Sequence, residues 1–274
     1  MINSYFAYFF AGNLRRAACR LRPYEVQPGA TDAAVAWCLD YLCEVMRTGG
    51  NKLEAARKVA DRLLEVETKP EPRPQVAIFG DLYARDNDVM NQGLIDTIEE
   101  NGGEVLTTPY SEYGRIVIKP YLKKWLREGL YKDVFAMSLA WAGVNLLETK
   151  YVEQFERVLG PTPRPEKSTG IDEVLALFGV DIHHTGESFD NLLKVFHLVE
   201  RYPNLALFVQ TNPAFCCPSL VTEAMSRRIE RATGVPVVTV TYDGTASNKN
   251  EVIIPYLQLA RERKSEKQSR RSRG

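Results

Sequence analysis

Two adjacent thiols, Cys216 and Cys217, are the residues whose type and position best fit a chemical role. They follow a continuous apolar run, residues 205–210, which is too short for a free-standing helix and indicates a strand buried on both faces. Pro218 then opens a helix that we expect to end near residue 234. Because chemistry in open α/β sheets collects at the carboxyl ends of strands, this thiol-bearing loop is the best functional candidate in the chain.

A thiol in this position can act as a metal ligand or as a nucleophile. A helix N-terminus favours the thiolate form, which both roles require. The sequence places no histidine or aspartate where it would activate the thiol of Cys216 or Cys217. A nucleophilic role is therefore the least favoured interpretation of this loop.

The composition is that of an ordinary globular α/β protein. The chain has 274 residues, of which 45% are hydrophobic, so it can bury a substantial core. Lys plus Arg and Asp plus Glu both number 35, and this balance gives no argument for nucleic acid or a membrane as partner. Five cysteines without a secreted-domain spacing favour a reducing, cytoplasmic compartment. The aromatic stretch 5–10 is too short to span a bilayer, which takes about 20 residues.

Helical periodicity and proline-rich breaks divide the chain into three parts. We expect a helical N-terminal region at 1–70, an α/β domain at 75–263 with a helical excursion at 113–159, and a basic disordered tail at 264–274. The expected connectors are 69–74 and 160–165.

The fold class that we predict is a three-layer α/β domain with a mainly parallel sheet. The expected strands are 76–80, 104–108, 205–210 and 236–242, with one more at 180–183. Right-handed crossovers put the exit loops of parallel strands on one edge of the sheet. The loops at 81–87, 212–217 and 243–250 should therefore converge there.

Polar residues in two of these loops are candidates for ligand binding. The first loop offers Asp81, Tyr83, Arg85 and Asn91, and the last offers Asp243, Thr245, Ser247 and Asn248. The alternative is that they are turn and capping residues.

Two other sets of potential metal ligands carry less weight. His183 and His184 have no third ligand at useful spacing, so a loop or capping role is favoured. Cys19, Cys38 and Cys43 fall on predicted helices and are expected to be small buried hydrophobic residues.

Four blocks of the sequence, in order, resemble a known family. They are Arg22-Pro-Tyr-Glu with Pro28-Gly29 and Thr31-Asp32; Gly80-Asp-Leu-Tyr-Ala-Arg-Asp-Asn with Asn91; Asn212-Pro-Ala-Phe-Cys-Cys-Pro with Leu220-Val-Thr-Glu-Ala; and Tyr242-Asp-Gly-Thr with Asn248-Lys-Asn. Together they resemble the 2-hydroxyacyl-CoA dehydratase D-component-like proteins, in the branch associated with the acyl-CoA dehydratase activases. The resemblance runs through almost the whole chain.

The resemblance implies a flavodoxin-like α/β domain that holds an iron–sulfur cluster, of the [4Fe–4S] type, through cysteines at strand ends. It also implies a partner ATPase that injects an electron, and a lyase reaction on an acyl-CoA. The metal ligands would be Cys216 and Cys217, with Cys216 preferred from the family's Cys-x-Pro pattern. The implied substrate-binding positions are Asp81, Tyr83, Arg85, Asn91, Asn212, Asp243, Thr245 and Asn248.

The chain departs from the family in one respect. Family members carry further cluster cysteines in preceding α/β segments, whereas this chain has a single strand-end cysteine site. A four-iron cluster typically takes four thiolates, so another chain would have to complete it, as in a split or truncated gene product. The alternative from a different class is a non-catalytic α/β subunit that binds a partner and lacks a complete metal site.

Overall fold

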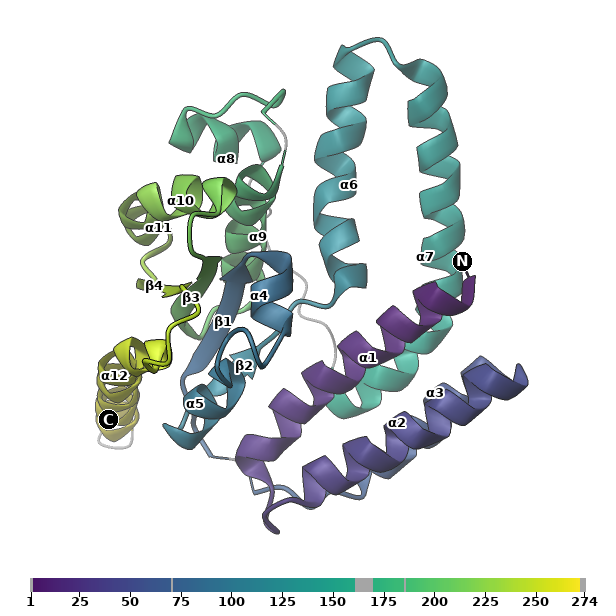
Figure 1. Ribbon diagram of the computed structural model, residues 1–274, viewed down its shortest axis with the longest axis vertical. Coiled ribbons are helices and arrows are strands. Elements are labelled where there is room, and N and C mark those ends of the chain that lie inside the picture. The colour runs from purple at the N-terminus through teal and green to yellow at the C-terminus, as the bar shows by residue number, and fades with distance from the viewer. Residues whose placement is uncertain (1, 70, 161–169, 185, 272–274) are drawn as a thin grey trace. The chain divides into compact units, whose positions relative to one another are not determined.

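The computed structural model describes residues 2–69, 71–160, 170–184 and 186–271 (Figure 1). The chain forms two compact units. The helical unit comprises Met1–Pro70 with Thr108–Pro163, and the sheet unit comprises Glu71–Thr107 with Arg164–Gly274.

The sheet unit is built on four parallel strands in the order β2-β1-β3-β4. The strands are β1 (Gln75–Gly80), β2 (Glu104–Leu106), β3 (Leu205–Pro213) and β4 (Val237–Tyr242). β1 and β3 are apolar and buried on both faces, which is the pattern of strands covered by helices on each side. The predicted parallel α/β sheet is thus confirmed, and its strand order is that of the first four strands of a flavodoxin-like sheet.

Helices cover the two faces of this sheet and make it a three-layer unit. One layer contains α9, α10 and α11, which contact one another. In this layer α9 contacts β1, α10 contacts β3 and α11 contacts β4, and α8 packs on α9. The other contains α5 and α12, which contact β2 and β3, and both also contact the short η2. The bounds are α4 (Leu82–Asp86), α5 (Leu94–Glu100), α8 (Ile171–Phe178), α9 (Glu187–Arg201), α10 (Cys217–Ala224), α11 (Ser226–Thr233), η2 (Lys249–Ile253) and α12 (Ile254–Arg271).

The helical unit has its own core of aromatic side chains. Phe9 and Phe10 of the first helix are 2% and 1% exposed, and both rings contact Tyr151 and Phe155 on the last helix of the unit. Asn51 caps the third helix by accepting hydrogen bonds from the amides of Leu53 and Glu54, at 3.0 and 3.2 Å. The elements are α1 (Ile2–Leu21), η1 (Arg22–Tyr24), α2 (Ala30–Thr48), α3 (Lys52–Leu64), α6 (Tyr110–Arg127) and α7 (Tyr131–Leu159).

The helical excursion groups with the N-terminal helices, whereas the sequence pattern had predicted that it belongs to the α/β domain. The reason is packing: the aromatic rings of α1 and α7 form one core, and Arg157 of α7 pairs with Asp61 of α3 at 2.7 Å. The domain boundary therefore does not follow chain order.

Other expectations need correction. Residues 180–183 form a turn and not a strand, because the Asp181 carboxylate accepts a hydrogen bond from the His183 amide at 2.8 Å. The helix after Cys216 is split at Met225 into α10 and α11. α12 continues to Arg271, past the predicted end near 263; disorder of the basic tail stays a prediction, and 272–274 lie outside the described residues. Most of the second connector, at 161–165, is also outside them.

Three of the cysteines lie in the helical unit. Cys19 and Cys38 are buried, as predicted, and burial raises the pKa of the Cys38 thiol to about 11. Cys43 is exposed, contrary to the expectation, because it lies on the outward face of α2.

Among the described residues, none of the helices combines the length and the apolar character needed to cross a lipid bilayer.

Candidate metal centre

Between β1 and β3, the direction in which the chain moves from strand to strand across the sheet reverses. The chain leaves β1 towards β2 at one edge, and it leaves β3 towards β4 at the other. The loops that follow these two central strands diverge, and the crevice between them is where open α/β sheets bind ligands.

Gly80 and Asp81 bring the end of β1 close to β3. Gly80 has φ +106°, and a Cβ atom there would lie 2.4 Å from the carbonyl oxygen of Thr211, so the position requires glycine. The Asp81 amide donates to the same carbonyl at 2.9 Å. The Asp81 Oδ1 atom accepts from the amides of Tyr83 and Ala84, at 3.0 and 2.7 Å, and thereby caps α4.

Glu187 joins this site from a distant part of the chain. It is the first residue of α9, and its Oε1 atom accepts a hydrogen bond from the Leu82 amide at 2.7 Å. Burial raises the pKa of the Glu187 carboxyl; the bond from Leu82 opposes this change, and the nearby Asp81 charge adds to it. The carboxylate form of Glu187 is therefore held at a cost that a bound cation would relieve.

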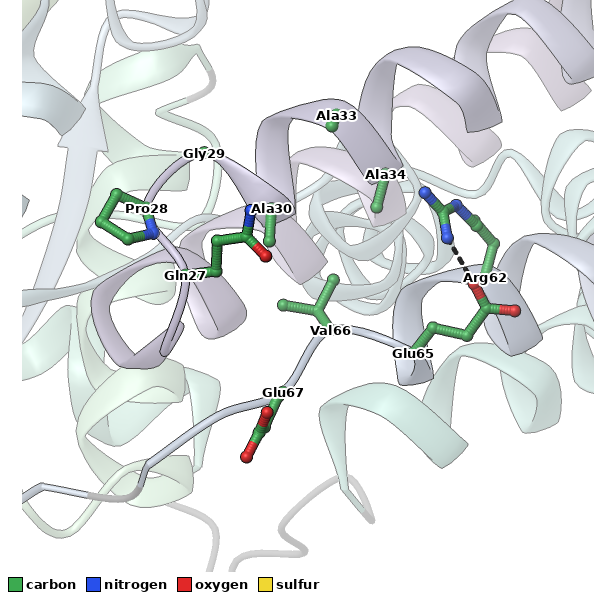
Figure 2. Close-up of a pocket in the computed structure, with 10 residues that line it drawn as sticks. All are labelled: Gln27, Pro28, Gly29, Ala30, Ala33, Ala34, Arg62, Glu65, Val66 and Glu67. Carbon is green, nitrogen blue, oxygen red and sulfur yellow. Dashed lines mark hydrogen bonds and ion pairs between the residues drawn. The ribbon is translucent and has the colours of Figure 1, made fainter.

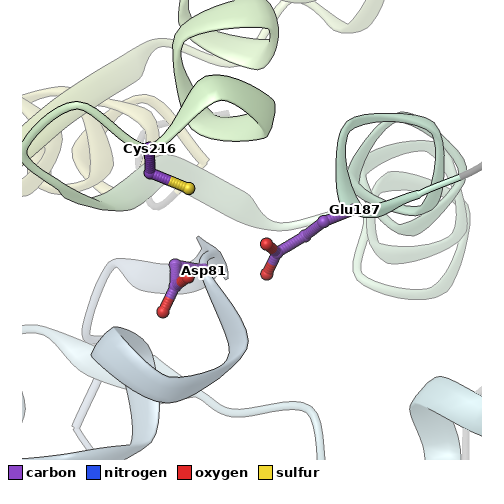
Figure 3. A group of neighbouring side chains, drawn as sticks. All are labelled: Asp81, Glu187 and Cys216. Carbon is purple, nitrogen blue, oxygen red and sulfur yellow. The ribbon is translucent and has the colours of Figure 1, made fainter.

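Cys216 completes the site from the β3 side. It precedes α10 as its N-cap residue, and its amide donates to the Pro213 carbonyl at 3.2 Å in a tight turn where Phe215 has φ +64°. Figure 3 shows the Cys216 sulfur directed towards the carboxylates of Asp81 and Glu187. Cys217, one residue on, is exposed and does not belong to this group.

The Asp81, Glu187 and Cys216 side chains form what we call the switch-point site. One ligand atom of each lies within 4.8 Å of the others, and all three residues are half-buried. Zn²⁺ binds cysteine sulfur at roughly 2.3 Å and carboxylate oxygen at roughly 2.0–2.2 Å in a tetrahedron. The three side chains therefore supply ligand types that Zn²⁺ accepts. Glu187 and Cys216 lie at the N-termini of α9 and α10, where the helix dipole favours negatively charged side chains.

The electrostatics of Glu187 predict how Glu187→Gln changes stability. A raised carboxyl pKa in the folded state means that Glu187 favours folding below its ordinary pKa of about 4.5 and loses this advantage as the pH rises through the raised value. Without metal, Glu187→Gln should therefore melt at a higher temperature than the wild type at about pH 8, and the difference should vanish near pH 4. Thermal melts across this pH range would check it, with Glu173→Gln, an exposed carboxyl in the first turn of α8, as the matched control. A lower melting temperature for Glu187→Gln at pH 8 would contradict the expectation.

The exit loop of β4 lies on the same edge of the sheet, as the parallel topology predicted. The Gln92 amide nitrogen donates to the carbonyls of Thr245 and Ser247, at 3.4 and 3.2 Å, and Gln92 Oε1 accepts from the Lys249 amide. The Ala214 amide donates to the Tyr242 carbonyl at 2.9 Å. The three predicted exit loops thus lie side by side.

The polar residues of the β4 loop hold its own turn. The Asp243 carboxylate accepts from the Thr245 hydroxyl at 2.7 Å and from Lys249 Nζ at 2.9 Å, and these two bonds hold the pKa of Asp243 well below its ordinary range. Asn248 Oδ1 accepts from the Asn250 amide and caps η2. Asp243, Thr245 and Asn248 thus make turn and capping contacts, and that they bind a substrate stays a prediction.

Of the remaining predicted substrate residues, three are buried and one is exposed. Asn91 is fully buried and donates to the carbonyls of Ala84 and Arg85, so it braces the loop after β1. Arg85 is 3% exposed and Asn212 is 1% exposed, and the Asn212 amide donates to Glu223 at 3.3 Å. Tyr83, 67% exposed, is open to solvent next to Asp81. That these residues bind a substrate stays a prediction.

Sequence reasoning placed Asp81 and Cys216 on neighbouring loops but missed Glu187. The signal that could have found it is an acidic residue at the start of a helix, directly after the turn that contains His183 and His184. Neither histidine belongs to the switch-point site: His183 contacts Asp181 at 2.6 Å and His184 contacts Ser188 at 3.1 Å.

A hollow lies in the helical unit. Its volume is about 450 Å³, and its lining includes the ion pair between Arg62 and Glu65 (Figure 2). The N-terminus of α2 beside it is already capped, because the Glu25 carboxylate accepts from the amides of Gly29 and Thr31 at 2.7 and 2.8 Å. Burial alone would raise the pKa of Glu25, but these bonds outweigh it and the pKa is lowered. This hollow therefore offers no open anion site at α2.

Comparison of the chain with protein-family models, with curated proteins and with solved structures found no match.

Proposed function

We propose that this protein binds a transition-metal ion at the switch-point site and contributes Cys216 to a metal centre shared with another chain. The observation that carries this proposal is the convergence of one thiol and two carboxylates within 4.8 Å at the carboxyl ends of β1 and β3. These three ligand types suit zinc or ferrous iron, and the sheet position is where ligands bind in this fold.

The charge balance supports a cation in particular. Each of the three side chains is anionic when it acts as a ligand, and the pKa of Glu187 is raised by burial and by its acidic neighbours despite Arg85 nearby. A divalent ion would remove this repulsion, because an opposite charge at close range favours the ionised carboxyl.

The finer part of the proposal comes from the family resemblance. It assigns the chain to an iron–sulfur 2-hydroxyacyl-CoA dehydratase-type system or an ATP-driven low-potential electron-transfer system. In such a system Cys216 would bind one iron of a [4Fe–4S] cluster, a second chain would bring the remaining thiolates, and an ATPase would supply the electron. The single thiol of the switch-point site supports sharing, because such a cluster typically takes four thiolates.

Anaerobic reconstitution tests this proposal. We expect the isolated chain, treated with iron and sulfide, to retain about one metal ion and little sulfide, whereas co-expression with a chain that carries further cysteines should give a four-iron absorption spectrum. The readouts are iron and sulfide per chain and the visible spectrum. Four irons per isolated chain, retained after both Cys216 and Cys217 are replaced by serine, would contradict it.

A second candidate function is a non-catalytic subunit that binds a protein partner. It is favoured by exposed apolar side chains on the loop and helix that carry Cys216, where Phe215 is 92% and Leu220 is 52% exposed. Loss of metal binding without loss of partner binding would separate the two functions.

A further inference from the structure

One surface of the first half of α7 is apolar and exposed, whereas the second half of the helix packs in the core of the helical unit. Phe135, Leu139 and Leu146 are 71%, 66% and 74% exposed. Their spacings of four and seven residues place them in one stripe along the helix. Ala142 and Gly143, also exposed, flank this stripe, and we call the five residues the outer face of α7.

No charged residue interrupts the helix from Val134 to Leu147. The inner surface of α7 is apolar as well, and Phe155 and Tyr151 farther along it contact Phe9 of α1. Ser138 and Asn145 are the two polar side chains of the stretch 134–147, and a helix this apolar is normally buried on most sides. An exposed apolar surface of this kind is typical of a protein–protein contact, so we expect the outer face of α7 to be covered by another protein chain.

Three exposed charged residues flank the outer face, Lys132 at one end and Lys150 with Glu153 at the other. Lys132 and Glu153 are both exposed, and both continue the stripe. Lys132 precedes Leu139 by seven residues, and Glu153 follows Leu146 by seven. Their midpoint falls between Ala142 and Gly143, the two smallest residues of the face. Leu139 and Leu146 are equidistant from this midpoint as well.

This arrangement is complementary to itself when two copies run antiparallel. A two-fold axis between Ala142 and Gly143 would place Leu139 against the partner's Leu146, and Lys132 against the partner's Glu153. It would also place the Phe135 ring against the partner's Lys150, a pairing in which a cation meets an aromatic ring. The small central side chains would let the helices approach closely. Parallel packing would instead oppose Lys132 to Lys132 and Glu153 to Glu153, which is unfavourable.

We propose that the outer face of α7 is a homodimer interface in which two copies of this chain pack antiparallel about Ala142 and Gly143. A single helix pair is a small interface, so we expect a dimer that dissociates on dilution. The inference is independent of the proposed metal site, since it uses residues of the helical unit alone.

Charge reversal of the full-length chain tests the pairing by sedimentation velocity over a concentration series. Lys132→Glu and Glu153→Lys should each raise the dissociation constant about five- to thirtyfold, because each removes both ion pairs of the dimer and opposes like charges. The double variant should restore the wild-type value. On a single helix the two residues are about 30 Å apart, so this rescue cannot arise within one chain.

Two further variants keep the test decisive. Leu139→Glu should leave the chain monomeric, and its exposed position means that circular dichroism and thermal stability should stay unchanged. Arg57→Glu, an exposed charge reversal on α3, should leave the dimer intact. A monomeric wild type at all concentrations, whether or not it binds lipid vesicles or another protein, overturns the proposal. Failure of the double variant to restore association overturns it as well.

Discussion

Replacing Cys216 by serine is expected to abolish metal binding at the switch-point site. Changes to residues that only contact a ligand already cost about 10- to 100-fold in affinity, so loss of the single thiolate should cost at least about 100-fold. Titration with Co²⁺ provides the measurement, because the sulfur-to-cobalt charge-transfer absorption appears only when a thiolate is bound. In Cys216→Ser that absorption should be absent.

The controls for this experiment distinguish the proposed metal ligand from cysteines that do not bind the metal. Cys217→Ser and Cys43→Ser should bind Co²⁺ as the wild type does, because both thiols are exposed and neither belongs to the site. Asp81→Asn should weaken binding yet preserve the fold, since the asparagine oxygen can still cap α4. If Cys217→Ser lost the absorption and Cys216→Ser retained it, the ligand assignment would be wrong.

Replacing Gly80 by alanine is expected to destabilise the sheet unit severely. The added Cβ would lie 2.4 Å from the Thr211 carbonyl oxygen and 2.8 Å from its nitrogen, so β1 and β3 would have to separate. Backbone strain at positive φ costs about 1–3 kcal/mol, and the clash with main-chain atoms adds to it. We expect a loss of at least about 3 kcal/mol, or a fall in Tm of roughly 6–12 °C.

Gly244→Ala is the matched control for Gly80→Ala. Gly244 also has positive φ, at +79°, but no atom lies within 4 Å of the position that the added methyl group would take. It should therefore lose only about 1–2 kcal/mol. Thermal or denaturant unfolding compares the two variants directly. Equal losses would show that the contact between Gly80 and Thr211 is not what makes this glycine necessary.

The sequence alone determined the local elements and the loops that carry two of the three residues of the switch-point site. The apolar run of β3 and the proline after Cys217 fixed the thiols on a strand-exit loop, because burial on both faces and helix initiation leave clear local patterns. The same reasoning placed Asp81 after β1. Parallel pairing then brought both loops to one edge, as right-handed crossovers require.

The tertiary structure decided which distant residues meet. Glu187 is 105 residues from Leu82, whose amide donates to its carboxylate, and no local pattern records that contact. The packing of α7 against α1 and α3, which moves the helical excursion into the other unit, depends likewise on aromatic rings far apart in the chain. Periodicity in a sequence indicates which side chains of a segment are buried. Which other segment they pack against depends on contacts between residues far apart in the chain, and these are seen only in the folded structure.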